Sequence, residues 1–255
     1  MPQNELVSRV EDVRRVLASA SEGRYSPPRL IAVTKTHPAE RILPLLEAGI
    51  CDIGENRVQE IVEKLPDIRK KFQIHLIGRL QSNKVKYIID DVCLIHSVDR
   101  LSLAQEIDRQ AQKHDRVMPV LVQVSPAGEE QKGGIAPEDV RPLLREMARM
   151  PGISVRGLMA VMPNTPDEAY LTGLFSDMRS LFDRLREEAI DGIAMDELSM
   201  GMSGDYHLAA RCGATMVRVG SAIFGPGAKS PREWNGRNEP CRFWIRRRPF
   251  CGASA

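Results

Sequence analysis

Lys35 stands at the end of a stretch that is typical of a buried β-strand. The four residues before it, Ile-Ala-Val-Thr at 31–34, are types that strands favour. Because burying an ammonium group is costly, a lysine in this position pairs with an acid, extends toward solvent or reacts. Desolvation lowers the pKa of lysines in general, and a neutral amine can attack an aldehyde. Two interpretations of Lys35 remain open at this point: a reactive amine, or a lysine that extends outward from the end of its strand.

Two short loops near the end of the chain combine glycine with serine. Ser203-Gly204 opens one predicted helix, and Gly220-Ser221 opens another. The first turn of a helix offers unpaired N–H groups and the positive end of the helix dipole, and both favour a phosphate. Together with a reactive lysine, the two loops predict one pocket for a phosphorylated ligand.

Arg218 precedes Gly220 by two residues and is expected just inside the same pocket. Its guanidinium carries only donors, so it can hydrogen-bond a ring nitrogen of a ligand. The alternative is a structural arginine that pairs with an acid such as Glu197. Residue types and spacing leave both interpretations open.

Other catalytic patterns fail on their details. The segment 220–226 has glycines at the spacing of a P-loop, but Pro226 stands where the lysine is required. Ser203, Asp205 and His207 have the residue types of a hydrolase triad. They lie on or beside one predicted helix, and short spacing does not create the geometry of a nucleophile and its base.

His75 falls within a predicted strand, 74–77, and is interpreted as a packed or hydrogen-bonded core residue. No cluster of His, Asp and Glu has the spacing of metal ligands. The five cysteines are scattered without a Cys-x-x-Cys pair, which argues against zinc and against a disulfide framework. With no secretory signal and no apolar run long enough to span a membrane, the sequence predicts a cytoplasmic protein.

These residues need a scaffold that brings strand ends together. Runs rich in Val, Ile and Leu alternate with amphipathic stretches, and the runs lack strict in–out alternation, as in a buried parallel sheet. The eight predicted strands are 29–35, 51–53, 74–77, 92–96, 118–124, 155–161, 197–200 and 216–219, and the predicted helices include 5–20, 82–89 and 137–150. We therefore predict an α/β fold, a single-domain (β/α)8 TIM barrel, whose site lies at the C-terminal ends of the strands. A doubly wound open sheet is the rival, although no strand-bounded Gly-x-Gly-x-x-Gly is present.

Charge is distributed unevenly along the 255 residues. The segment 229–255 carries seven Lys and Arg against two Asp and Glu, a net +5, which leaves 29 against 32, a net −3, for residues 1–228. We predict that 1–228 form the barrel and that 229–255, polar and Arg-rich, are a disordered tail. A mildly acidic body is a poor general binder of nucleic acid.

Several segments resemble the pyridoxal phosphate homeostasis family. They are residues 32–36, 54–59, 75–84, 157–160, 198–203 and 214–221. Each segment alone is modest, but their order and spacing together are specific. Members of this family are single-domain barrels related to the N-terminal domain of alanine racemase.

The resemblance implies that the chain holds pyridoxal 5′-phosphate (PLP) as a Schiff base on Lys35, with Arg218 near the pyridine nitrogen. The other cofactor-binding residues that it implies are Asn56 beside the ring, His75 and Ser199 nearby, and Ser203, Gly204, Gly220 and Ser221 around the phosphate. It also implies a monomer that holds PLP and supplies it to PLP-dependent apo-enzymes, without substantial turnover.

Two other functions are weighed against this one: a PLP-dependent amino-acid racemase, and an aldolase that uses Lys35. A two-base racemase needs a proton donor on each face of the substrate carbon. Resemblance to alanine racemase places the second base, a tyrosine, in an added β-domain, and no tyrosine follows Gly225. An arginine at the ring nitrogen would also make the cofactor a weaker electron sink. The sequence therefore favours a non-catalytic carrier.

Overall fold

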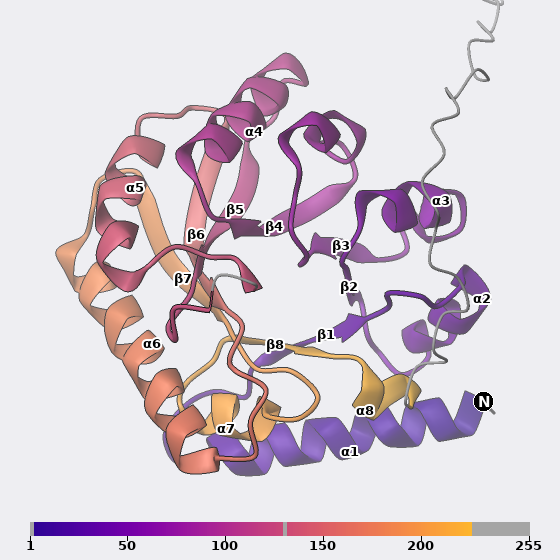
Figure 1. Cartoon of the computed structure of the whole chain (residues 1–255). Helices are drawn as coiled ribbons and strands as arrows, with labels where there is room; N and C mark the ends of the chain where they lie inside the picture. Colours follow the sequence, from indigo (N-terminus) through magenta and orange to yellow (C-terminus); the bar gives the residue numbers. More distant parts are fainter. Residues whose placement is uncertain (1–2, 130–131, 226–255) are drawn as a thin grey trace, which may run out of the picture.

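Eight parallel strands close into a barrel in the computed structural model, which describes residues 3–129 and 132–225. Each strand pairs with the next along the chain, and β8 pairs with β1 to complete the ring (Figure 1). The strands are β1 (Arg29–Val33), β2 (Asp52–Glu55), β3 (Gln73–Leu76), β4 (Val92–Val98), β5 (Met118–Val124), β6 (Ile153–Ala160), β7 (Ile193–Ser199) and β8 (Met216–Val219). The prediction of a TIM barrel is confirmed, and the rival open sheet is wrong.

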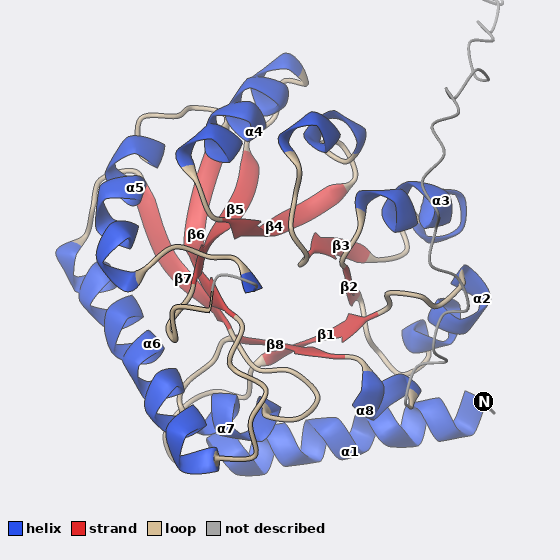
Figure 2. Cartoon of the chain, viewed as in Figure 1, coloured by secondary structure: helices blue, strands red, loops and turns tan. Residues whose placement is uncertain are grey.

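Helices surround the barrel and cover the outer face of the strands (Figure 2). They are α1 (Gln3–Ser21), α2 (Ala39–Ile42), η1 (Leu43–Leu46), α3 (Val58–Ile68), η2 (Ser82–Tyr87), α4 (Leu101–Lys113), η4 (Pro137–Asp139), α5 (Val140–Met147), α6 (Glu168–Glu188), α7 (Tyr206–Arg211) and α8 (Ser221–Phe224). The η elements are 3-10 helices. The predicted helix at 82–89 is one of them, η2, which ends at Tyr87 and whose buried residue is Val85.

Strand β7 begins at Ile193, earlier than the predicted 197. Two acidic residues, Asp196 and Glu197, interrupt its apolar pattern and hid its first half. Both acids form ion pairs near the N-terminal ends of the strands. Asp196 pairs with Arg156 of β6 at 2.6 Å, and Glu197 pairs with Arg29 of β1 at 2.9 Å.

Side chains alternate between the two faces of each strand, and those that point inward form two cavities with an apolar cluster between them. In β1, Arg29, Ile31 and Val33 share one face, because side chains alternate with a period of two. Arg29 lines a hollow at the N-terminal end of the barrel, and Val33 lines another at the C-terminal end. Between them, Ile31 packs in a small apolar cluster whose other buried members are Leu94, Leu121, Met159 and Met216. The barrel is therefore closed in the middle and open at both mouths.

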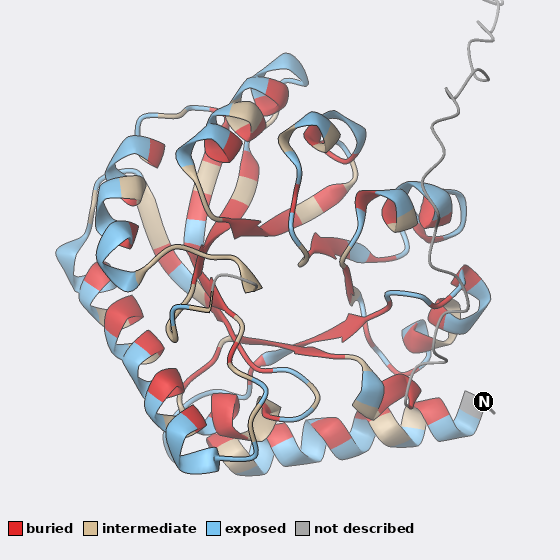
Figure 3. Ribbon diagram, viewed as in Figure 1, coloured by how far each residue is buried: buried red, intermediate tan, exposed pale blue. Residues whose placement is uncertain are grey.

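The larger apolar core lies between the strands and the surrounding helices. In Figure 3 the strands are mostly buried, and the helices are buried on the side that faces them. The buried residues of α1 are Leu6, Val10, Val13 and Leu17. This spacing of three and four residues was expected for a helix with one apolar face, and α1 packs with that face toward α7 and α8.

The predicted disordered tail, 229–255, and the domain boundary at 228 lie outside the described residues. None of the helices in the described ranges combines the length and apolarity needed to cross a lipid bilayer. Residues 3–129 and 132–225 also contain no group of three His, Cys, Asp or Glu that could hold a metal ion.

Candidate functional site

The hollow at the C-terminal mouth is a cavity of about 530 Å³, which is within the usual range for small-molecule sites. Seven of the nine residues predicted to bind a cofactor line it: Lys35, Asn56, Ser203, Gly204, Arg218, Gly220 and Ser221. Among its described lining residues there are four basic side chains and no Asp or Glu. The cavity is thus suited to an anion.

Lys35 lies two residues after the end of β1 and extends into this cavity from an exposed turn. Within the described residues its amine has no ion pair and no hydrogen bond. Lys132, the other lysine on the wall, pairs with Glu129 at 2.6 Å and donates to the carbonyl of Met162 at 2.9 Å. Lys35 is therefore the amine that is free to react.

The turn that carries Lys35 is held in an uncommon backbone conformation. Thr36 has a φ of 65°, in the left-handed region that a β-branched residue rarely adopts. Such a residue costs about 1–3 kcal/mol and persists only when its surroundings enforce it. Here the N–H of Thr36 donates to Oε2 of Glu60 on α3, at 2.7 Å.

On the other side of Lys35, Thr34 is fixed by a buried ion pair. Nζ of Lys64 donates to the carbonyl of Thr34 at 3.0 Å and to Oε1 of Glu55 at 2.7 Å, and the hydroxyl of Thr34 donates to the same carboxylate oxygen at 2.6 Å. Burial raises the pKa of Glu55, and the hydrogen bond and charge of Lys64 partly oppose that rise. The sequence analysis missed this pair. Its one visible signal is the helical spacing of Glu60 and Lys64, which are four residues apart.

Ser203 joins the two glycine–serine loops. Its hydroxyl oxygen accepts hydrogen bonds from the N–H groups of Gly220 at 3.0 Å and Ala222 at 3.4 Å. These groups belong to the start of α8, so both loops meet at one edge of the cavity. Gly204 and Ser221 are exposed there.

The hydrolase triad is absent from this region, as expected. Asp205 accepts from the backbone N–H of Met202 at 2.5 Å, and His207 lies 3.6 Å from a carboxylate oxygen of Glu168. Ser203 therefore has neither side chain as a base.

Arg218 reaches the floor of the cavity from β8 and is only 3% exposed. Nη1 donates to the hydroxyl oxygen of Ser199 at 2.6 Å, and Nη2 donates to the carbonyl of Ala160 at 2.8 Å. Burial lowers the pKa of Arg218 to about 10, partly opposed by the charge of Asp205. The alternative pairing with Glu197 is wrong, because that acid contacts Arg29 and Thr215 instead.

His75 and Ser199 lie behind the cavity, and neither is among its lining residues. His75 is 1% exposed and has a partner at each ring nitrogen: Asp52 at 2.9 Å and His96 at 3.0 Å. The interpretation of His75 as a hydrogen-bonded core residue is confirmed. Ser199 lies beneath Arg218 and contacts its guanidinium.

Asn56 is another lining residue of the cavity. Its position depends on a close backbone contact with a glycine. Gly78 follows β3, and a Cβ at this position would overlap the backbone of Asn56, including its carbonyl oxygen. The loops after β2 and β3 can therefore approach each other only with glycine at 78.

Comparison with known proteins finds relatives that match most of the chain. The model of the alanine racemase N-terminal domain matches residues 10–227. The pyridoxal phosphate homeostasis protein of Aquifex aeolicus is 40% identical over 223 residues, which cover 87% of this chain and 96% of that protein. A crystal structure of an unknown protein from Bifidobacterium adolescentis has a TM-score of 0.83 at 35% identity and covers 87% of this chain and 95% of that one.

A second solved structure is PipY of Synechococcus elongatus with PLP bound. It has a TM-score of 0.76 at 34% identity, and the match covers 86% of this chain and all of that one, 100%. Alanine racemase of Clostridium difficile has a TM-score of 0.69 at 15% identity, which shows a shared fold alone. By its family model and its close relatives, the chain belongs to the alanine racemase N-terminal domain family and, within it, to the pyridoxal phosphate homeostasis proteins.

Proposed function

We propose that this chain binds PLP in the C-terminal cavity and serves PLP homeostasis by holding the cofactor and releasing it. The observation that carries the proposal is the free amine of Lys35, which faces the glycine–serine loops across a cavity whose described lining residues include no carboxylate. When bound, PLP supplies an aldehyde that condenses reversibly with a primary amine and releases water. Lys35 is the amine that we assign to this bond.

The residues present fit the rest of the cofactor. A phosphate carries between one and two negative charges near neutral pH, and the basic wall of the cavity matches that charge. Ser203, Gly204, Gly220 and Ser221 supply hydroxyl and N–H donors at one edge. Charge-assisted hydrogen bonds to such donors are about twice as strong as neutral ones. We place the phosphate there.

We place the ring between Asn56 on one side and the floor of the cavity on the other. The guanidinium of Arg218 lies at the floor of the cavity, and both of its Nη atoms already donate to protein acceptors. Its remaining N–H groups are the ones we assign to the pyridine nitrogen. Because an arginine can only donate, this contact favours an unprotonated ring nitrogen.

A carrier rather than a racemase is the function that the relatives favour. The curated relatives at 36–41% identity carry the name pyridoxal phosphate homeostasis protein, whereas the likeness to racemases is one of fold. We infer that PLP-dependent apo-enzymes receive the cofactor and that the protein acts as a monomer in the cytoplasm.

The test is to incubate the purified protein with PLP, reduce it with borohydride and map the modified residue by mass spectrometry. We expect the cofactor on Lys35, and we expect Lys35→Ala to lose both the visible absorbance band and the trapped cofactor. Lys113→Ala, at an exposed position at the end of α4, is the matched control and should behave as the native protein. Cofactor trapped on Lys84 or Lys132 instead would overturn the assignment.

A further inference from the structure

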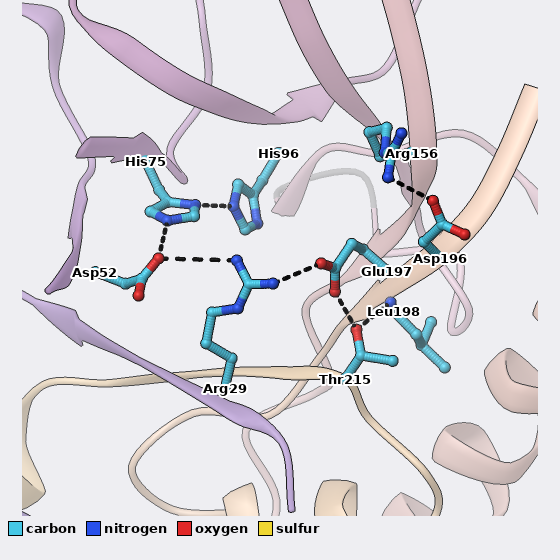
Figure 4. Close-up of polar contacts among 9 residues, drawn as sticks. All are labelled: Arg29, Asp52, His75, His96, Arg156, Asp196, Glu197, Leu198 and Thr215. Atoms are coloured by element: carbon cyan, nitrogen blue, oxygen red, sulfur yellow. Dashed lines mark hydrogen bonds and ion pairs between the residues drawn. The ribbon is translucent and has the colours of Figure 1, made fainter. Parts of the chain in front are cut away.

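A chain of hydrogen bonds crosses the barrel interior from one mouth to the other. Asp52 at the N-terminal mouth contacts Nε2 of His75 at 2.9 Å, and Nδ1 of His75 contacts Nε2 of His96 at 3.0 Å. Nδ1 of His96 contacts the hydroxyl of Ser199 at 3.0 Å, and that oxygen accepts from Arg218 at 2.6 Å. Figure 4 shows the first part of this chain, where the two imidazole rings lie between Asp52 and the barrel interior.

Arg218 and Asp52 stand at the two ends of this series of hydrogen bonds. Their chemistry gives all of the bonds the same direction. A guanidinium can only donate, and an ionised carboxylate can only accept. Ser199 therefore accepts from Arg218 and has its own O–H left to donate to Nδ1 of His96. Nε2–H of His96 then donates to Nδ1 of His75, and Nε2–H of His75 donates to Asp52. With both rings neutral, this order places the proton of each ring on Nε2.

Burial supports the neutral state of the His96 ring. His96 is fully buried, and burial holds its pKa well below the ordinary value, with the charge of Arg218 lowering it further. A proton added to either ring would leave two donors facing each other inside the barrel. A buried donor without an acceptor destabilises the folded protein.

Among the described residues no carboxylate lies within ion-pair distance of the Arg218 guanidinium, although Asp205 is near enough to raise its pKa. Hydrogen bonds that share one direction polarise one another, so the chain transmits part of the effect of Asp52 to Arg218. Arg29, which lies 3.9 Å from Asp52 and 2.9 Å from Glu197, fixes the far end of the chain (Figure 4).

We propose that Asp52, His75, His96 and Ser199 are positioning residues for Arg218: as a one-directional relay they fix the orientation of its guanidinium at the floor of the cofactor cavity. The importance of this relay for the cofactor rests on the proposed function, whereas its direction does not. Two residues predicted beside the cofactor, His75 and Ser199, thus act through Arg218.

The direction is tested without cofactor. Nitrogen-15 NMR of the apo-protein at neutral pH reports which ring nitrogen carries the proton. We expect the Nε2–H tautomer for both His75 and His96, and slow rotation of the Arg218 guanidinium. A proton on Nδ1 of His96, or a doubly protonated ring, would overturn the relay even if PLP binds as proposed.

The effect on the cofactor is tested with Ser199→Ala, which removes one acceptor from Arg218 and the donor to His96. We expect a mixture of tautomers at His96, faster rotation of the guanidinium, and PLP binding weakened about tenfold, which corresponds to one lost hydrogen bond. Ser21→Ala is the control, because Ser21 is equally buried and its hydroxyl has no partner among the described residues.

His96→Gln keeps one donor and one acceptor and should lie between the native protein and His96→Leu in PLP affinity. A folded Ser199→Ala with native tautomers and native PLP affinity would show that the relay does not position Arg218. Failure of the native protein to bind PLP would instead refute the proposed function and leave the tautomer result to stand on its own.

Discussion

The backbone N–H of Thr36 donates to Oε2 of Glu60 at 2.7 Å, which ties the residue after Lys35 to helix α3. On the other side of the lysine, the carbonyl of Thr34 accepts from Lys64 of the same helix at 3.0 Å. Helix α3 therefore holds both neighbours of Lys35, and the lysine side chain is the free part of an otherwise fixed turn.

Replacing Glu60 should loosen this turn. Glu60→Ala removes the acceptor that stabilises the left-handed Thr36, so we expect a loss of about 1–3 kcal/mol in the free energy of unfolding and weaker PLP binding. Glu60→Gln keeps an oxygen that can accept from Thr36 and should retain most of both. Urea unfolding and titration with PLP measure the two quantities.

The control for this pair is Glu63→Ala, an exposed residue of the same helix. It should leave stability and PLP affinity within experimental error of the native values. Equal losses in Glu60→Ala and Glu63→Ala would mean that helix content, and not the contact with Thr36, determines the result.

A negative charge at Ser203 should expel the phosphate. Ser203→Asp places a carboxylate beside the N–H groups of Gly220 and Ala222, where it competes for the donors and repels the ligand. We expect PLP affinity to fall by roughly 100-fold or more, or about 3 kcal/mol. Ser203→Ala leaves those N–H groups available and should cost much less.

Pyridoxal, which lacks the phosphate, provides the matching test on the ligand side. It should bind the native protein far more weakly than PLP, and Ser203→Asp should affect it little. Equal affinity of the native protein for the two forms would rule out a phosphate site at these loops.

The fold followed from periodicity, because buried parallel strands and amphipathic helices each leave a local pattern. Strand 118–124 was predicted with its exact bounds, and the interruption by Asp196 and Glu197 shows where such patterns fail. Asp196 lies outside the predicted strand, 197–200, but it is a strand residue that pairs with Arg156 of the neighbouring strand β6. Glu197 was predicted as a strand residue, and its partner, Arg29 of β1, is brought near by the closed ring.

Part of the cavity wall could be predicted from the sequence, because the ends of predicted strands carry some of its residues. Lys35 and Arg218 each sit at the C-terminal end of a predicted strand, so the barrel brings them to the same mouth. The relay through His75 and His96 was not predictable, since its members come from different strands and the contact of His96 with Ser199 joins β4 to β7 inside the closed barrel. Nothing local distinguishes His96 from a packed core histidine.

The buried His96 makes stability depend on pH. Its pKa is well below 6.5 in the folded protein and about 6.5 in the unfolded chain, so the unfolded state binds more protons between those values. The free energy of unfolding should therefore fall as the pH drops below about 6.5. For this one residue, we expect a loss of about 1 kcal/mol between about pH 7 and pH 5.5.

Comparison with His96→Gln isolates this contribution. His37, whose pKa burial also lowers, acts in the same direction in both proteins, while the raised pKa values of Glu55 and Asp205 act in the opposite direction nearer pH 4.5. The native protein should lose more stability than His96→Gln over the range above. Parallel pH profiles for the two proteins would show that His96 takes up a proton in the folded state.

The cavity should hold PLP without rapid turnover of amino acids. Racemisation needs an acid or base on each side of the substrate carbon, and a positioned one contributes typically about 10²–10⁴-fold. The titratable side chains on the described wall are Lys35, Arg79, Lys132 and Arg218, and Lys132 is already paired with Glu129. Only Lys35 is an uncommitted base there. We therefore expect slow exchange of the Cα proton when the PLP-loaded protein is incubated with L-alanine in deuterated water, with no D-alanine in the NMR spectrum or on a chiral column. Fast exchange with D-alanine that disappears in Lys132→Ala would identify Lys132 as a second base and make the protein a racemase.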